Sequence, residues 1–289
     1  MRIDQILKNK RTLSFEVFPP KKAETETEGL FETIRELKKL KPDFISVTYG
    51  ASGSNARNSA EIAGFIKSEG IEPLAHVTGG PSTPEQIDSV AENLKTLGIE
   101  NVLALRGDKP SDYAENYCKY FRHATDLQKY LKKYGFTLGA ACYPEGHQEC
   151  ESLYADLENL KKKEECGAKF FITQIFYDNA YYYRLVNEAR KNGIHSPIVP
   201  GIMPITNPKN IARIKTMCGS TIPIELRNML EVYSKDPVLM REAGINYAVY
   251  QIMDLIAKGA PGVHLYIMNR ADTAFEIYER LHNFFNELF

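Results

Sequence analysis

Short runs of β-branched and aromatic residues alternate along the chain with longer segments that repeat leucine and isoleucine at helical spacing. The first apolar run, residues 12–18, stops at Pro19 and Pro20, because proline cannot donate to a strand ladder. The segment that follows, residues 24–41, has apolar residues three and four positions apart, as on one face of a helix. This strand-then-helix pattern continues to the end of the chain.

The pattern predicts eight strands, each followed by a helical segment. The predicted strands are residues 12–18, 44–48, 73–77, 101–105, 137–143, 169–174, 197–202 and 262–267. The predicted helices are residues 24–41, 59–69, 82–97, 121–134, 152–166, 180–192 and 271–285, another that starts at Asn207, and an extra helical excursion near 221–258.

Strands and helices that alternate through mostly short connections are typical of the α/β class and predict a (β/α)8 TIM barrel. The main alternative is an open doubly wound sheet, but such sheets usually carry a Gly-x-Gly-x-x-Gly turn after an early strand, and this sequence has none. No internal repeat, low-complexity tract or linker divides the chain. We therefore expect residues 1–289 to form a single barrel domain that carries the catalytic site.

Composition narrows the class of protein. A hydrophobic content of 43% and a net charge of −1 suit a globular protein and give no electrostatic reason to expect nucleic acid or an anionic membrane as a partner. No apolar run approaches the roughly 18 residues of a membrane span, and the N-terminus lacks a signal-peptide core. The five cysteines are widely spaced without Cys-x-x-Cys, as in reduced cytosolic proteins. We expect a cytoplasmic protein.

Polar residues stand where nearly every predicted strand ends. Glu16 interrupts the first apolar strand, and a carboxylate buried without partners is so costly that it must be paired, protonated or functional. In a TIM barrel the active site is built from the C-terminal ends of the strands. The candidates found there are Glu16, Thr48, Tyr49, His76, Arg106, Gly107, Asp108, Tyr143, Glu145, His147, Gln174, Tyr266, Asn269 and Arg270.

Each candidate also has a purely structural interpretation. Glu16 can be a salt-bridged core glutamate, and His76 a satisfied core histidine. Arg106 and Asp108 can form an ion pair that closes their own turn, and Gln174 can cap a neighbouring loop. Another group at helical spacing is either a solvated face or a site where lysines neutralise a pyrophosphate: Asp156, Asn159, Lys162 and Lys163.

Several enzyme classes lack their signature in this sequence. There is neither a Gly-x-x-x-x-Gly-Lys-Ser/Thr phosphate loop nor a Gly-x-Ser-x-Gly elbow. His76 and His147 have no clustered third ligand, so we expect no metal site. A Schiff-base aldolase needs a lysine inside the barrel, whereas the sixth strand ends in Thr173 and Gln174. The remaining groups suit a large planar cofactor and a heterocyclic substrate better than a hydrolysis.

Seven motifs, in order along nearly the whole chain, resemble the bacterial-type FAD-dependent methylenetetrahydrofolate reductases. They are residues 14–21, 46–51, 104–108, 143–147, 172–174, 200–204 and 266–270. The resemblance implies a (β/α)8 barrel that binds FAD and serves one-carbon metabolism and methionine biosynthesis. The implied reaction reduces 5,10-methylenetetrahydrofolate to 5-methyltetrahydrofolate by hydride transfer from reduced flavin, with NADH or NADPH as the expected electron donor.

The resemblance also implies roles for individual residues. Glu16 would be the general acid that opens the five-membered ring of the substrate, and Asp108 would hydrogen-bond the pterin beside the flavin. Gln174 and Arg270 match folate-contacting positions. The positions that match FAD contacts are Thr48, Tyr49, Ala51, His76, Arg106, Gly107, Asp108, His123, Ala124, Tyr143, His147, Asp156, Asn159, Lys162 and Lys163. The sequence departs from the family pattern at Lys162, where an arginine is expected, and at Asn210 and Ile214, where glutamine and an aromatic residue are expected.

Two other functions stay open at this point. One is a flavin-binding subunit of a larger redox complex that takes electrons from a partner protein or ferredoxin. The other is a flavin-free pterin-binding barrel that transfers methyl groups. We expect a homo-oligomer. The tyrosines at 181–183 can form an interface or pack within the chain, and we favour packing.

Overall fold

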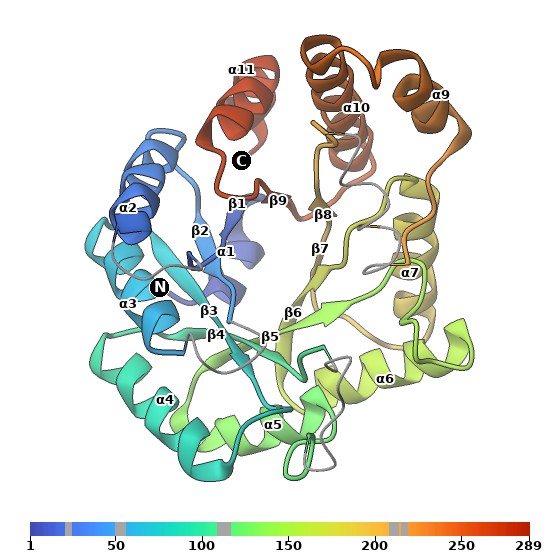
Figure 1. Ribbon diagram of the computed structural model, residues 1–289. Coiled ribbons are helices and arrows are strands. Elements are labelled where there is room, and N and C mark those ends of the chain that lie inside the picture. Colours follow the sequence, from blue (N-terminus) through green and yellow to red (C-terminus); the bar gives the residue numbers. More distant parts are fainter. Residues whose placement is uncertain (21–24, 50–55, 109–116, 208–213, 215–218) are drawn as a thin grey trace.

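The computed structural model describes residues 1–20, 25–49, 56–108, 117–207, 214 and 219–289. Within these residues, nine parallel strands form one sheet that curves into a nearly closed barrel, and helices surround it (Figure 1). The structure confirms the single-domain (β/α)8 fold that the sequence pattern predicts.

The strands follow the sequence prediction to within one residue at each end, except where the seventh is divided. They are β1 (Thr12–Val17), β2 (Phe44–Val47), β3 (Glu72–Thr78), β4 (Asn101–Leu105), β5 (Thr137–Cys142), β6 (Ala168–Thr173), β7 (Ile198–Val199), β8 (Gly201–Ile202) and β9 (Gly262–Tyr266). The helices are α1 (Ile3–Asn9), α2 (Thr25–Lys38), α3 (Ala56–Ser68), α4 (Pro84–Thr96), α5 (Ala124–Leu131), α6 (Leu153–Glu165), α7 (Asn179–Lys191), α9 (Ile224–Tyr233), α10 (Pro237–Ala257) and α11 (Ala271–Leu288), with a 3-10 turn η1 (Lys132–Tyr134).

The seventh strand is divided at Pro200. β7 pairs with β6, and β8 pairs with β9, so the two edges of the sheet are the two halves of one segment, residues 198–202. Pro200 has no N–H to donate, but its carbonyl accepts a hydrogen bond from the His264 amide at 2.9 Å. The proline therefore interrupts the ladder without opening the barrel.

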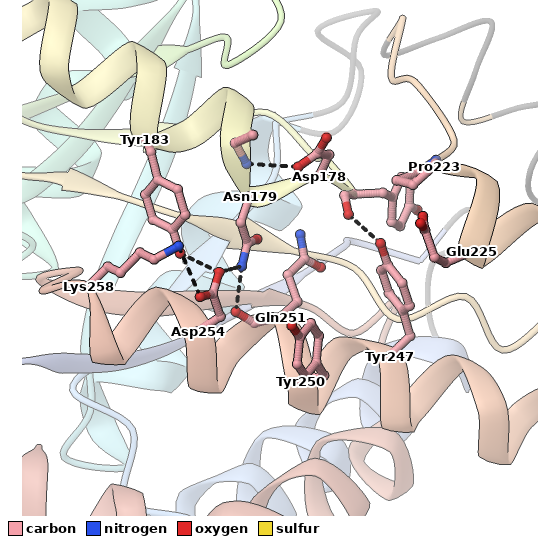
Figure 2. A pocket seen from close by; sticks show the side chains of 12 residues that line it. Asp178, Asn179, Tyr183, Pro223, Glu225, Tyr247, Tyr250, Gln251, Asp254 and Lys258 are labelled. Atoms are coloured by element: carbon pink, nitrogen blue, oxygen red, sulfur yellow. Dashed lines mark hydrogen bonds and ion pairs between the residues drawn. The ribbon is translucent and has the colours of Figure 1, made fainter.

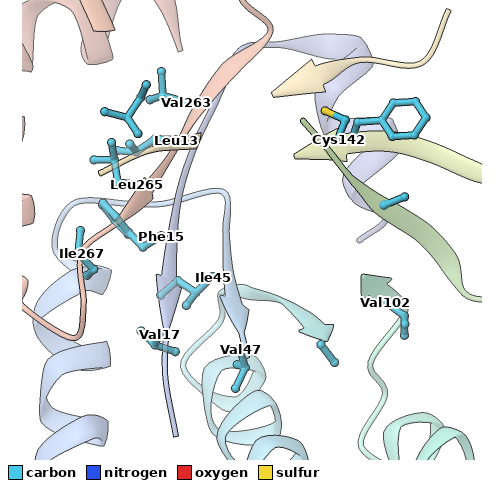
Figure 3. Close-up of a cluster of buried hydrophobic side chains, with 14 of the residues drawn as sticks. Leu13, Phe15, Val17, Ile45, Val47, Val102, Cys142, Val263, Leu265 and Ile267 are labelled. Carbon is cyan, nitrogen blue, oxygen red and sulfur yellow. The ribbon is translucent and has the colours of Figure 1, made fainter. Parts of the chain in front are cut away.

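The main hydrophobic core lies between the sheet and the surrounding helices. Successive residues of a strand point to opposite faces, so alternate residues of each strand enter this layer. Figure 3 shows members of the layer on β1, β2 and β9: Leu13, Phe15, Val17, Ile45, Val47, Val263 and Leu265. The intervening residues of β1, Ser14 and Glu16, therefore point into the barrel.

Helix α1, which the sequence reading does not predict, closes the end of the barrel where the strands begin. Ile3 and Leu7 pack against apolar residues that point into the barrel, among them Phe44 and Phe170. The Asn101 side chain fixes the helix, because its Oδ1 accepts from the Ile3 amide at 2.9 Å and its Nδ2 donates to the Met1 carbonyl at 3.1 Å. The barrel thus has an apolar floor.

The predicted helical excursion near 221–258 consists of α9 and α10. In Figure 1, α10 lies between α7 and α11 in the outer ring, and it contacts both helices. Arg241 on α10 forms ion pairs with Asp272 and Glu276 on α11. No helix among the described residues is both long and apolar enough to cross a membrane.

The tyrosines at 181–183 lie on α7. The hydroxyl of Tyr182 donates to the Ile198 carbonyl at 2.8 Å, and that of Tyr183 donates to Asp254 on α10 at 2.5 Å. Both side chains therefore pack within the chain.

Candidate active site

A buried carboxylate lies near the end of β1, inside the barrel. Glu16 is 7% exposed, and the strand register places it beside Ser46 on β2 and Tyr266 on β9. Its Oε2 accepts a hydrogen bond from Ser46 Oγ at 3.3 Å and lies 3.5 Å from His76 Nε2 and 3.8 Å from His264 Nε2. No lysine or arginine of the described chain pairs with it, so Glu16 is not a salt-bridged core glutamate of the usual kind.

A chain of polar side chains lies directly behind Glu16. His264 Nε2 is 3.3 Å from Ser46 Oγ, and His264 Nδ1 is 2.8 Å from Ser14 Oγ. Ser14 in turn donates to the Val263 carbonyl at 3.1 Å. Ser14, Ser46 and His264 are fully buried, so their hydrogen bonds to one another are needed to satisfy groups that water cannot reach. Below this polar layer the interior is apolar, down to the floor formed by α1.

The electrostatics of His76 depend mainly on its burial. Burial lowers the pKa of His76 to about 4, against the weaker opposing effect of the Glu16 carboxylate, and His264 lowers it further. At neutral pH His76 is therefore uncharged, and its Nε2 makes no hydrogen bond within the described residues. The neighbour of Glu16 is thus a neutral imidazole rather than a cation.

Arg106, in the loop after β4, is held by an ion pair with Glu149 in the loop after β5, which the sequence pattern does not predict. Its two terminal nitrogens donate to the two carboxylate oxygens of Glu149 at 2.7 and 2.8 Å. The alternative of an ion pair between Arg106 and Asp108 is therefore wrong. Gly107 has a φ of +87°, and a Cβ there would overlap Thr78 on β3, so only glycine fits this close turn.

A second group of predicted residues lies on the β5–α6 loop and along one side of α6. Asp156 Oδ2 accepts from the His147 amide at 3.1 Å, and the ring of His147 lies edge-on to Tyr143 with centroids 4.6 Å apart. Lys163 Nζ lies 5.4 Å from the Tyr143 ring centroid and donates to the Ala141 carbonyl at 2.8 Å. Helical spacing thus brings Asp156 and Lys163 to one side of α6.

The charges in this group act on one another. Burial lowers the pKa of Lys163, and burial followed by the nearby Arg106 lowers the pKa of His147. Burial raises the pKa of the Tyr143 hydroxyl, and Asp156 and Asp108 raise it further. Lys163 forms no ion pair with a carboxylate in the described part of the chain, although Arg106 lies near enough to influence its pKa. Arg106 is neutralised by its ion pair with Glu149, so Lys163 is the cation of this group that is left to attract an anionic ligand, although the nearby Asp156 carboxylate partly offsets its charge.

Cys150 connects two of the α6 residues. Its Sγ donates to Asp156 Oδ1 at 3.6 Å and accepts from Asn159 Nδ2 at 3.5 Å. Asn159 therefore joins the group, whereas Lys162 lies on the exposed side of the same helix.

The remaining predicted residues form no single cluster. Burial raises the pKa of Tyr49, which shares a hydrogen bond with Ser82, and Thr48 is partly buried beside it in the chain. His123 is exposed at the N-terminus of α5, with Ala124 next to it, and Asp108 is exposed too. Ala51 and Asn210 lie outside the described residues.

The two positions that resemble folate contacts are held locally. Gln174 Oε1 accepts from the Ile175 amide at 2.8 Å, as expected of a side chain that caps a loop. The guanidinium of Arg270 pairs with Asp272 in the first turn of α11, at 2.7 Å, and is largely exposed. Ile214 is 6% exposed and packs in an apolar cluster with Tyr177 and Met203, away from solvent.

Sequence reasoning missed Ser14, Ser46 and His264 of the polar layer. A signal was present, because these residues stand at alternate positions of otherwise apolar strands, as Glu16 does. Glu149 and Cys150 had no comparable signal, because they lie in a loop whose path is set by tertiary contacts. Among the described residues, no three His, Cys, Asp or Glu side chains are grouped so that they could hold a metal ion.

A cavity of about 410 Å³ lies outside the barrel between α7 and α10 (Figure 2). None of the predicted site residues lines it. Its polar groups are largely paired with one another: Asn179 and Tyr183 donate to Asp254, which also pairs with Lys258. These bonds hold α7 against α10, so the cavity is separate from the group around Glu16.

Sequence comparisons identify the relatives of this chain. A family profile described as methylenetetrahydrofolate reductase matches residues 2–282. The 5,10-methylenetetrahydrofolate reductases of Pectobacterium carotovorum and Escherichia coli are each 36% identical, over 95% and 93% of this chain and 91% and 90% of their own lengths. Methylenetetrahydrofolate reductase (NADH) 1 of Arabidopsis thaliana is 38% identical over 93% of this chain, which spans only 48% of that plant protein.

Solved structures share the fold at lower identity. An uncharacterised Clostridium thermocellum protein, described as binding two copies of 5-methyl-5,6,7,8-tetrahydrofolic acid, has a TM-score of 0.66 at 17% identity, over 98% of this chain and 100% of that one. An oxaloacetate acetylhydrolase has a TM-score of 0.55 at 11% identity, over 99% of this chain and 86% of the other. These likenesses concern the barrel alone. The profile match over nearly the whole sequence, together with the two bacterial relatives, shows that the chain belongs to the methylenetetrahydrofolate reductase family.

Proposed function

We propose that this protein reduces 5,10-methylenetetrahydrofolate to 5-methyltetrahydrofolate with FAD as its cofactor. The observation that carries the proposal is the buried carboxyl group of Glu16, which lies inside the barrel near the strand ends without a lysine or arginine partner. A family of reductases that must open a five-membered substrate ring needs an acid at such a place.

Glu16 would protonate the substrate so that its ring opens to the reactive iminium. The neutral His76 suits this role, because an imidazolium at 3.5 Å would favour the ionised carboxylate and so oppose its use as an acid. Ser46 would hold the carboxyl group in one orientation, and His264, 3.3 Å from the Ser46 hydroxyl, would in turn position Ser46. Asp108, exposed near the start of the loop after β4, would hydrogen-bond the pterin, and Gln174 and Arg270 would contact the rest of the folate.

The group around Tyr143 fits an anionic cofactor that carries aromatic rings. Lys163 supplies positive charge, and Arg106 adds a guanidinium that pairs with Glu149 in this structure. Tyr143 and His147 supply ring surfaces, and Asp156 and Asn159 supply polar groups on the same side of α6. Gly107 supplies close backbone approach at the loop after β4. When bound, FAD would supply the hydride for the opened substrate after recharging by a nicotinamide donor.

The test is the visible spectrum of the purified protein during anaerobic addition of NADH and then NADPH. NADH comes first because the name of the Arabidopsis relative specifies it. A flavin band that bleaches and is restored by methylenetetrahydrofolate is the expected result, and the bleaching nucleotide identifies the donor. Protein that stays colourless after reconstitution with FAD would overturn the proposal.

A partner-dependent flavin subunit is the second candidate. It is favoured by Ile214, an aliphatic residue packed in an apolar cluster at the position where an aromatic is expected. A flavin band that neither nucleotide bleaches, but that a ferredoxin does, would support this candidate over the self-sufficient reductase.

A further inference from the structure

The side chain of Asn269 holds the end of β1 against the turn that follows β9. Its Oδ1 accepts from the Phe18 amide, and its Nδ2 donates to the Phe18 carbonyl, both at 2.8 Å. Phe18 stands two residues after Glu16, and Asn269 stands three residues after Tyr266, the β9 partner of Glu16 in the strand register. The amide of Asn269 therefore extends the β1–β9 ladder beyond its last backbone pair.

Asn269 is the only hydrogen-bond partner of the Phe18 backbone in the described chain. Before Phe18, the β1 backbone is held on both sides by β2 and β9, and the Val17 carbonyl still accepts from the Thr48 amide at 3.1 Å. Beyond Val17, within the described residues, only the side-chain amide of Asn269 continues the pairing. The position of Phe18, two residues beyond Glu16, therefore depends on this side chain among the described contacts.

The backbone of the turn is arranged so that Asn269 can reach Phe18. Met268 and Asn269 have φ values of 53° and 59°, in the left-handed region that asparagine tolerates better than most residues. The next residue is Arg270, whose amide donates to the Ile267 carbonyl at 3.0 Å and which precedes α11. One turn thus connects the strand end of Glu16 to the arginine that resembles a folate contact.

We propose that Asn269 is a positioning residue for folate reduction, because it fixes Glu16 and Arg270 relative to each other. This inference rests on the proposed function. Only an amide offers a donor and an acceptor side by side as a peptide group does, so aspartate keeps the bond from the Phe18 amide and loses the bond to the Phe18 carbonyl. The side chain of Asn269 bonds the Phe18 backbone, and in the described residues it has no hydrogen bond to the Glu16 carboxyl group or the Arg270 guanidinium.

Three variants separate positioning from folding. Asn269→Gly keeps a backbone that tolerates positive φ but removes the amide, and Asn269→Asp keeps only the acceptor. Met268→Gly, in the same turn, relieves left-handed strain at an exposed residue and leaves the contact with Phe18 intact, so it is the matched control.

The experiment measures the two half-reactions separately by anaerobic stopped flow, with hydrogen exchange at the Phe18 amide as an independent readout. For Asn269→Gly we expect faster Phe18 exchange, a folate half-reaction slowed about 10- to 100-fold, and flavin reduction by the nicotinamide within about twofold of the wild type. Asn269→Asp should be intermediate, and Met268→Gly should match the wild type in both half-reactions.

Other results would overturn the inference. Faster Phe18 exchange without slower folate reduction would show that the contact does not position Glu16. An equal loss of both half-reactions would show a merely structural role. A wild-type protein that binds flavin yet reduces no methylenetetrahydrofolate would overturn the proposed function itself, and the positioning role with it.

Discussion

The ability of Glu16 to act as an acid depends on the side chains that surround its carboxyl group, and not only on how deeply that group is buried. Its nearest polar neighbours are a hydroxyl and two imidazoles, and burial keeps one imidazole, His76, uncharged at neutral pH. A carboxyl group beside a hydroxyl and a neutral imidazole can exchange a proton with a substrate, whereas one paired with arginine would stay ionised.

Replacing Glu16 by glutamine should abolish folate reduction and leave flavin reduction by the donor nearly unchanged. Glutamine keeps the size and the hydrogen-bond acceptor but has no proton of suitable acidity to give. Stopped-flow measurement of each half-reaction tests this, with Glu36→Gln on the exposed face of α2 as a control that should change neither. Equal losses in both half-reactions for Glu16→Gln would contradict its role as the acid.

The low pKa of His76 predicts a pH dependence of stability. Its pKa in the folded protein is about 4, below the ordinary 6.5, so the unfolded chain binds the extra proton between these values. The free energy of unfolding should therefore fall as the pH drops from 6.5 toward 4, by on the order of 3 kcal/mol from this group.

Urea titrations at pH 7.5 and pH 5 would measure this dependence. His76→Gln should flatten the difference between the two pH values, because glutamine does not titrate. An unchanged pH dependence in the variant would show that other groups are responsible. Asp88 does not interfere, since its pKa is lowered from 3.8 to about 2, outside this window.

The sequence was informative about single residues where they broke a pattern. Glu16 stood out because it interrupts an apolar strand. Lys163 stood out because it lies at helical spacing from Asp156 and Asn159, on one side of the predicted helix. The contacts among these residues were not predictable. His264 reaches Ser14 only through the register of β1 with β9, which joins residues about 250 positions apart, and the bond between Arg106 and Glu149 depends on the path of a loop.

Among the elements, the strands were the most predictable because a barrel strand is a short β-rich run between turn signals. Helix α1 escaped prediction because it has only 7 residues and buries three of them, too few for a clear helical period. The division of the seventh strand at Pro200 was not predicted, because the apolar residues continue without a break on both sides of the proline.

Truncating Ile3 should show how much the floor contributes. Ile3 is fully buried against the apolar side chains inside the barrel, so Ile3→Ala should lower the free energy of unfolding by about 2–5 kcal/mol. Urea denaturation measures the change. Lys8→Ala on the exposed side of α1 is the control, with an expected effect within about 0.5 kcal/mol. A small loss for Ile3→Ala would mean that α1 lies on the barrel without sealing it.

At the scale of the whole molecule, the residues around Tyr143, which would hold the cofactor in the proposed function, lie on one side of the barrel, on two loops and one helix. Any ligand that binds only the folded protein stabilises it, by about 2.7 kcal/mol at a concentration 100-fold above its Kd. Adding FAD to flavin-free protein should therefore raise its melting temperature in a concentration-dependent way.

Lys163→Met should weaken this stabilisation, because the variant lacks a charge beside Tyr143 that suits an anionic cofactor. Thermal melts with a series of FAD concentrations would measure it. Lys169→Met, at an exposed position near the start of β6, is the control and should respond to FAD as the wild type does. An unchanged response in Lys163→Met would place the cofactor elsewhere.

The architecture as a whole was predictable because one motif, a strand followed by a helix, repeats along the sequence and leaves few ways to pack. The way the barrel closes was not predictable, because the sheet is completed by two strands of only two residues, β7 before Pro200 and β8 after it. The packing of α10 between α7 and α11 also depends on contacts between distant segments, such as those of Arg241 with α11.

The sealed floor has a consequence for how the acid is resupplied. Beneath Glu16 the hydrogen-bonded chain ends at the carbonyl of Val263, which has no proton to give, and apolar side chains follow. We therefore expect Glu16 to exchange protons with water from the end of the barrel where the strands finish, where the folate would bind in the proposed reaction. Glu16 would then have to be protonated before the substrate binds, and it would give each bound substrate one proton. It would take up the next proton from water only after the product leaves.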